Sequence, residues 1–176
     1  MLANCAILLT AGSTQVINAS QLDALIRELV ARKKNPVLVL GPDGDDLLRS
    51  CQELEACDLV FDPNYEGDYF SGIKAGLHAV NGPAFVIPVG QDLLPAQSWA
   101  ELELALLRLD STQKVDVLRP VTPGVSESRY PQIVTNTGLQ ALKRLPATTP
   151  WTNSHQIVAI EVAVKSSNDE TQQSSL

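Results

Sequence analysis

Short apolar runs alternate along the chain with longer stretches in which apolar residues recur every three or four positions. A short apolar run is the pattern of a buried strand, and the recurring spacing is that of an amphipathic helix. Strands are predicted over residues 6–10, 37–40, 59–61, 84–89, 115–118, 132–135 and 157–164. Such alternation predicts stacked βαβ units and a mainly parallel sheet.

The clearest helical pattern follows the first strand. Its apolar residues fall at i, i+3, i+4, i+7 and i+8, and Ser20 stands before them as the expected N-cap. These residues are Leu22, Leu25, Ile26, Leu29 and Val30. Further helices are predicted over residues 45–55, 70–80, 99–109 and 139–145.

The last third of the chain differs in character. Residues 120–131 are rich in Pro, Gly and Ser, and no helical crossover joins the fifth predicted strand to the sixth, as expected when a later strand runs in the opposite direction. We therefore expect an α/β fold of three layers, with a mostly parallel sheet, helices on both faces and an antiparallel strand late in the chain. Residues 1–165 are expected to form one domain, and the polar residues 166–176 a disordered tail.

Composition narrows the function classes. The chain of 176 residues is 44% hydrophobic and 19% charged, which is typical of a globular protein. Its formal charge of −7 argues against a nucleic-acid partner. The apolar run at residues 5–9 is too short for a signal segment or a membrane span, so we expect no membrane association and a cytoplasmic location.

Two small groups of residues have ordinary interpretations. The basic cluster Arg32, Lys33 and Lys34 is interpreted as a solvated helix end. The three cysteines, Cys5, Cys51 and Cys57, are odd in number and lack C-x-x-C spacing, so reduced thiols are expected, with Cys5 in the core.

Ligands of open α/β sheets bind outside the carboxyl ends of the strands. The loops at these ends cover residues 10–13, 41–44, 62–72 and 90–94. Candidate binding residues are therefore sought in these four loops.

A family resemblance is carried by five segments: AILLTAGS, NPVLVLGP, DPNYEGDYFSGIKAGLHAV, FVIPVGQDLLP and RPVTPGVSESRYPQIVT. Together they resemble, in order and spacing, the molybdenum cofactor guanylyltransferases and related MobA-like NTP transferases, over residues 5–164. The resemblance implies the nucleotide-diphospho-sugar transferase fold. It also implies a nucleotidyltransferase that uses Mg²⁺ to transfer a nucleotidyl group from an NTP to a small phosphorylated acceptor such as molybdopterin.

The first loop departs from the family pattern. Relatives have Gly-Gly-x-S/G-x-R-M-G-x-x-K, in which Arg and Lys hold the triphosphate. Here Ala11, Gly12 and Ser13 match its start and are predicted to contact the nucleotide, but residues 11–19 contain no cation. A transferase stabilises a leaving pyrophosphate with fixed positive charge, so this loss bears directly on catalysis.

The metal-binding turn departs as well. The family places an Asp directly after the core strand, because Mg²⁺ prefers carboxylate and phosphate oxygens. Gly90 occupies that position, and Asp92 follows two residues later. We predict Asp92 as the Mg²⁺ ligand if the turn is rearranged; the alternative is a helix-capping or turn residue.

The third segment matches better. Asn64, Gly67, Ser71 and Gly72 match family positions at the loop and helix that face the nucleotide, and are predicted to bind it. The N–H groups of a helix N-terminus can bind an anion. Alternatively, Ser71 or Asp68 serves as an ordinary N-cap.

Three hypotheses about function remain open. The chain is a nucleotidyltransferase, a catalytically lapsed relative that binds a ligand or a protein partner in a regulatory role, or an unrelated doubly wound protein, because fold alone does not give function. In the first two the partner is a small-molecule nucleotide. No residue is predicted as catalytic.

Overall fold

The structure, a computed structural model, describes residues 2–10, 17–42, 44–62, 69–90, 95–109, 114–121, 131–145 and 159–164. Within these residues seven strands form one sheet in the order β3-β2-β1-β4-β6-β5-β7. The strands are β1 (Cys5–Leu9), β2 (Asn35–Leu40), β3 (Asp58–Phe61), β4 (Ala84–Pro88), β5 (Val117–Val121), β6 (Gln132–Val134) and β7 (Ala159–Ala163). The predicted tail, residues 166–176, lies outside the described residues.

Strand directions agree with the sequence prediction. The pairs β1–β2, β1–β4, β2–β3 and β5–β7 are parallel, whereas β6 runs antiparallel to both β4 and β5. The predicted mostly parallel sheet with a late antiparallel strand is therefore confirmed. Since β6 is reversed between β4 and β5, those two strands point the same way, and their carboxyl ends lie at the same edge of the sheet.

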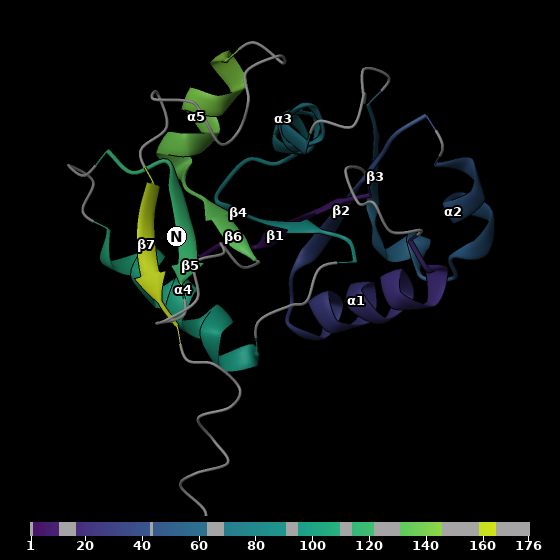
Figure 1. Cartoon of the computed structure of the whole chain (residues 1–176), viewed down its shortest axis with the longest axis horizontal. Helices are drawn as coiled ribbons and strands as arrows, with labels where there is room; N and C mark the ends of the chain where they lie inside the picture. The colour runs from purple at the N-terminus through teal and green to yellow at the C-terminus, as the bar shows by residue number, and fades with distance from the viewer. Residues whose placement is uncertain are drawn as a thin grey trace, which may run out of the picture.

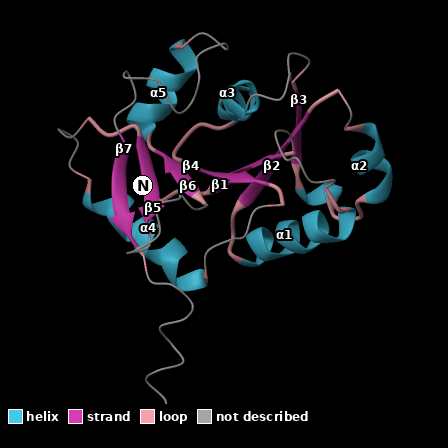
Figure 2. Ribbon diagram, viewed as in Figure 1, coloured by secondary structure: helices cyan, strands magenta, loops and turns pink. Residues whose placement is uncertain are grey.

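Helices cover both faces of the sheet, and the prediction of three layers is confirmed. They are α1 (Ala19–Ala31), α2 (Asp45–Ser50), the short 3-10 helix η1 (Leu54–Ala56), α3 (Tyr69–Ala79), α4 (Ala96–Arg108) and α5 (Asn136–Arg144). Figure 1 shows α1 and α4 on one side of the sheet and α3 and α5 on the other, and Figure 2 shows the same layers by type of element.

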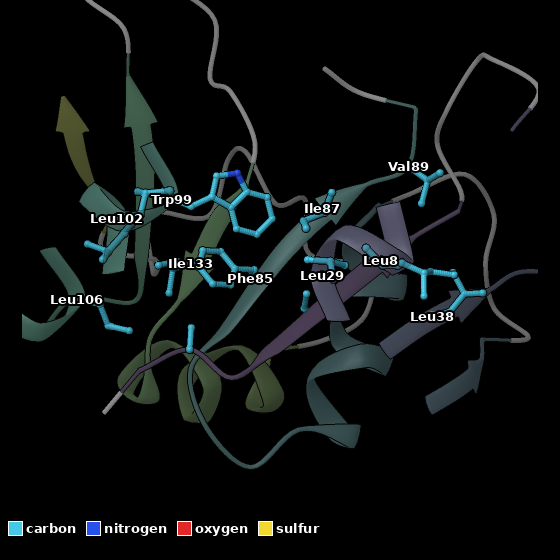
Figure 3. Close-up of a cluster of buried hydrophobic side chains, with 14 of the residues drawn as sticks. Leu8, Leu29, Leu38, Phe85, Ile87, Val89, Trp99, Leu102, Leu106 and Ile133 are labelled. Carbon is cyan, nitrogen blue, oxygen red and sulfur yellow. The ribbon is translucent and has the colours of Figure 1, made fainter. Parts of the chain in front are cut away.

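Each face has its own hydrophobic core. The α1/α4 core joins apolar residues of α1 and α4 to one face of the strands, and includes Phe85 against Trp99 with ring centroids 4.9 Å apart (Figure 3). The α3/α5 core joins Phe70, Leu77 and Leu142, among others, to the opposite face. Consecutive residues of a strand point to opposite faces of the sheet. If one residue belongs to the α1/α4 core, the residues directly before and after it therefore face the α3/α5 side.

Helices α3 and α5 are fastened to each other through their ends. Lys74 Nζ donates to the carbonyl of Leu145, which caps α5, and Lys143 Nζ donates to the carbonyl of Val80, 3.4 Å away and directly after α3. A lysine near the end of a helix satisfies carbonyls that have no intrahelical donor and interacts favourably with the helix dipole. Each helix thus caps the other.

Two details of the helix predictions are wrong. Asn18, and not Ser20, is the N-cap of α1, and its side chain accepts a hydrogen bond from the Ser20 N–H at 2.9 Å. The helix predicted over residues 45–55 ends at Ser50, and η1 follows separately. Between them, buried Asp23 of α1 accepts hydrogen bonds from the backbone N–H groups of Gln52 and Glu53, both at 3.0 Å. That long-range contact holds the chain out of helical conformation.

The basic cluster is not a solvated helix end. Lys34 has a side chain only 10% exposed, and its Nζ donates to Glu103 of α4 and, at 2.8 Å, to the carbonyl of Ala3. Arg32 pairs with Glu28 at 2.7 Å and lies 4.9 Å from the ring centroid of Trp99. Both cations therefore join α1 to the rest of the α1/α4 layer.

The cysteines are free thiols, as predicted, but Cys5 is only half-buried at the margin of the α3/α5 core. Among the residues described above, no helix combines the length and the apolar character needed to cross a bilayer.

Candidate functional site

The parallel strands end together at one edge of the sheet, which we call the carboxyl edge. Leu9 of β1 is in register with Val39 of β2 and with Pro88 of β4. Directly after β1, the Thr10 hydroxyl donates to the carbonyl of Val39 at 2.9 Å. The first loop of the family resemblance therefore leaves the sheet between β2 and β4.

Asp62 and Ser71 form a polar pair at the β3 end of this edge. Asp62 follows β3 directly, is 5% exposed, and donates its N–H to the carbonyl of Leu40 at 2.9 Å. The hydroxyl of Ser71, in the first turn of α3, donates to Asp62 Oδ2. The pair thus ties the N-terminus of α3 to the end of β3.

The helix dipole of α3 favours the position of the Asp62 carboxylate beside the N-terminus of that helix. Val60 packs against the α3/α5 core, so Asp62, two residues later, lies on the same face as α3. A carboxylate beside the N-terminus of a helix is stabilised by the helix dipole. The Asp62–Ser71 pair consequently orients the first turn of α3, whose N–H groups point toward the carboxyl edge.

Gly90 occupies the position at which the resemblance expects a carboxylate. The N–H of Val89 still donates to the carbonyl of Leu9 at 2.8 Å, after which Gly90 takes a φ of 89°. Residues with a side chain rarely adopt this conformation. The turn after β4 is therefore built around a glycine, and an aspartate at position 90 would be strained.

The structure brings two of the predicted binding residues to the expected place. Ser71 and Gly72 lie in the first turn of α3, the hydroxyl of Ser71 being bound to Asp62. The other predicted residues lie outside the described part of the chain. They are Ala11, Gly12, Ser13, Asn64 and Gly67 for the nucleotide and Asp92 for the metal.

Within the described ranges, no group of three His, Cys, Asp or Glu side chains is arranged to hold a metal ion. The thiols are also unsuited to catalysis. Burial, assisted by nearby Cys51, Asp58 and Asp23, raises the pKa of Cys57 from 9.0 to about 11. Because the thiolate is the reactive form, Cys57 stays protonated and unreactive at neutral pH.

Two polar residues that sequence reasoning passed over lie on the α3 face of β5 and β6, level with Val86 in the middle of β4. Arg119 is a half-buried residue of β5, and Gln132, 2% exposed, begins β6. The available signal was a charged residue inside the otherwise apolar strand VLRPV. We call these residues the Arg119–Gln132 pair.

Comparison with known proteins gives structural but no sequence matches. No family model matches the chain, and no curated protein matches it in sequence. Rv0371c from Mycobacterium tuberculosis H37Rv has a similar structure, with a TM-score of 0.64 and 13% identity, covering 96% of both chains. The 4-diphosphocytidyl-2C-methyl-D-erythritol synthase from Anaerococcus prevotii DSM 20548 has a TM-score of 0.59 and 13% identity, covering 90% of this chain and 88% of the synthase. A further such synthase has a TM-score of 0.54 and 13% identity, covering 97% and 96%.

The fold is similar to that of Rv0371c and of the two matched synthases. It agrees with the nucleotide-diphospho-sugar transferase fold that the family resemblance implies, without singling out the molybdenum cofactor guanylyltransferases. At this level of identity the similarity concerns architecture, and function has to be argued from the site.

Proposed function

We propose that this protein binds an NTP at the carboxyl edge and transfers its nucleotidyl group to a small phosphorylated acceptor. The observation that carries the proposal is the architecture: the sheet with its late antiparallel strand matches two 4-diphosphocytidyl-2C-methyl-D-erythritol synthases over most of both chains. In such a sheet the ligand site lies at the carboxyl ends of the strands. The Asp62–Ser71 pair supports the proposal by orienting the first turn of α3 there.

The proposed reaction is an in-line displacement at phosphorus. An oxygen of the acceptor phosphate attacks the α-phosphorus of the NTP, the bond from that phosphorus to the bridging oxygen breaks, and pyrophosphate leaves with the electron pair. Negative charge builds up on the leaving group, and preorganised donors stabilise it. The N–H groups of the first turn of α3 are donors of this kind.

The family resemblance implies Mg²⁺, but the described residues do not make a site for it. The expected acid position holds Gly90 at a φ of 89°, and Asp62 is bound to Ser71. Asp62 also stands three strands away from β4, about 14 Å at the usual strand spacing. We therefore give Asp62 a positioning role, propose Asp92 as the metal ligand, and base no step of the reaction on Mg²⁺.

Two acceptors are candidates. The family resemblance favours molybdopterin with GTP. The name of the matched synthases describes a diphosphocytidyl product, which favours CTP with 2C-methyl-D-erythritol phosphate. Both acceptors carry a phosphate monoester, so the proposed chemistry is the same.

A second candidate function is nucleotide-dependent regulation without transfer. It is favoured by the glycine at the acid position together with a first loop that contains no cation. Loss of a transition-state charge clamp commonly costs several kcal/mol, which reduces a rate by orders of magnitude.

Calorimetric titration with GTP, CTP and ATP, with and without Mg²⁺, followed by an assay of pyrophosphate release with each acceptor, separates these functions. A transferase binds an NTP and releases pyrophosphate only when the acceptor is present. Binding without release in any combination supports the regulatory function. Absence of NTP binding under all conditions contradicts both.

A further inference from the structure

Arg119 is a cation that forms no ion pair with any residue that the structure describes. Its Nε is buried without a hydrogen-bond acceptor, and within the described residues its guanidinium makes no hydrogen bond or ion pair. Buried polar groups in native proteins are nearly always hydrogen-bonded, so an exception points to a function or to a bound ion.

The other partly buried cations of the described chain show the usual arrangement. Lys34 contacts Glu103 and the carbonyl of Ala3, and Arg32 contacts Glu28. Each of these side chains joins two parts of the structure and has an oxygen within reach. Arg119 has no such role, so its charge is not explained by the packing of the described residues.

The strand register defines the surroundings of Arg119. Leu118 pairs with Ile133 in the antiparallel pair β5–β6, and the next step places Arg119 opposite Gln132. Leu118 and Ile133 belong to the α1/α4 core, so Arg119 and Gln132 face the other way, toward the α3/α5 side. In the parallel pair β5–β7, Arg119 is in register with exposed Glu161.

The position of the pair relates it to the proposed reaction. Gln132 is in register with Val86 of β4, and Arg119 lies one strand beyond, about 10 Å from β4 at the usual spacing. The Asp62–Ser71 pair lies on the same face, beyond the carboxyl end of β3 on the other side of the sheet. A ligand held by α3 over β1 and β2 would therefore present its reacting phosphorus between the two pairs.

We propose that Arg119 binds the phosphoryl group of the acceptor. A guanidinium offers planar paired donors that fit two phosphate oxygens. The ligand class is a phosphate monoester. This inference rests on the proposed function for the identity of the acceptor, but its binding chemistry can be tested separately.

Binding of inorganic phosphate, followed by calorimetry and by the shift of Tm, is the first test. Arg119→Gln should weaken phosphate binding by about tenfold or more, because two charge-assisted hydrogen bonds are lost. Arg119→Lys should restore only part of the affinity, since an ammonium lacks the paired donors. The matched control is Arg108→Gln, an exposed arginine of α4, which should bind phosphate as the wild type does. Equal affinity in wild type and Arg119→Gln would overturn the proposal.

The stability of the ligand-free protein separates a binding role from a structural one. If Arg119 serves a ligand, Arg119→Met removes an unsatisfied buried donor and should raise Tm by about 2–4 °C while abolishing the stabilisation by phosphate. If Arg119 is structural, for example through an ion pair with Glu161, the same substitution lowers Tm. A lower Tm combined with unchanged phosphate binding would overturn the proposal.

These results do not depend on the success of the transfer assay. Phosphate binding that requires Arg119 in a protein that binds no NTP would support this site and contradict the proposed function. NTP binding and pyrophosphate release that are unaffected by Arg119→Gln would support the proposed function and contradict the phosphate site at Arg119.

Discussion

Two pairs of polar residues lie on the same face of the sheet, one beside β3 and one on β5 and β6, and they differ in how their buried polar groups are hydrogen-bonded. At the β3 end, the buried carboxylate of Asp62 accepts a hydrogen bond from the hydroxyl of Ser71 and so holds the first turn of α3. At the β5 end, Arg119 lies on the strand next to that of Gln132, and its Nε is buried without an acceptor among the residues that the structure describes. Both places carry polar groups on the same face of one sheet.

The difference shows how structural and ligand-binding polar residues can be told apart. A buried polar group that is satisfied within the protein contributes to positioning, because its desolvation is offset by the hydrogen bond. One that lacks a partner destabilises the fold unless a ligand supplies that partner. The β3 end is therefore scaffold for the site, and the β5 end is where we expect the acceptor.

The largest change in the free energy of unfolding is expected from Gly138→Ala. This substitution tests whether α5 is packed tightly against the residues before β5. A Cβ at Gly138 would overlap the carbonyl oxygen of Asp116, directly before β5. Neither backbone segment can move without disturbing the α5 N-cap at Thr135, so the free energy of unfolding should fall by about 3 kcal/mol. Denaturant unfolding measures it.

The control for this substitution is Gln140→Ala on the exposed side of α5, which should change stability by less than about 0.5 kcal/mol. A Gly138→Ala protein as stable as this control would mean that α5 is loosely held. The β5 end would then be too mobile to keep Arg119 in place.

The next effect tests the closed β3 end. Ser71→Ala leaves the buried Asp62 carboxylate without its hydroxyl donor and should reduce the free energy of unfolding by about 1–3 kcal/mol. Ser50→Ala is the matched control, because the Ser50 hydroxyl donates to a backbone carbonyl in an exposed position. Equal stability of the two variants in urea would show that the Asp62–Ser71 pair does not fasten α3.

A smaller effect is expected midway along the edge, at Gly90. Its φ of 89° costs an L-amino acid roughly 1–2 kcal/mol, so Gly90→Ala should lower the free energy of unfolding by that amount. Gly90→Asp should carry the same penalty and fail to increase Mg²⁺ affinity. A stable Gly90→Asp protein with tighter Mg²⁺ binding would show that the turn after β4 accepts the family's carboxylate.

The smallest effect concerns the thiol before β3. Burial raises the pKa of Cys57 in the folded protein to about 11, so the unfolded chain ionises first as the pH rises. The contribution of Cys57 to stability should consequently be fully present below about pH 9 and be lost toward pH 11. Solvent screening of this half-buried group limits the loss to about 1 kcal/mol. Cys57→Ala should show a decline smaller by that amount in urea melts across this range, and an identical pH profile would show that burial does not raise the pKa of Cys57.

Apolar periodicity predicts most of the fold, because the positions that recur in the sequence are the ones that pack. Leu22, Ile26 and Leu29 are fully buried in α1, and the strand from Ala84 is buried throughout. Val30 was expected in the same stripe but is 47% exposed, since it lies at the margin of the helix face. Local spacing cannot locate that margin.

Contacts between distant segments account for what could not be predicted. Lys34 is buried because Glu103, far along the chain, lies opposite it, and the helix after Gly44 is short because Asp23 binds the following backbone. The place of Ser71 and Gly72 at the start of the helix after β3 could be predicted from local spacing. Arg119 and Gln132 meet only through the reversed strand β6, whose register no local pattern specifies.

The central claim is that a nucleotide binds at the carboxyl edge of the sheet. Amide NMR spectra recorded during titration with GTP or CTP test it most directly, because the chemical shift of each backbone amide reports on its own surroundings. We predict shifts concentrated at Thr10, Ser71, Gly72 and Gly90, with Asn35 at the opposite edge unaffected. Shifts concentrated around Asn35, or none at all with either nucleotide, would contradict the account.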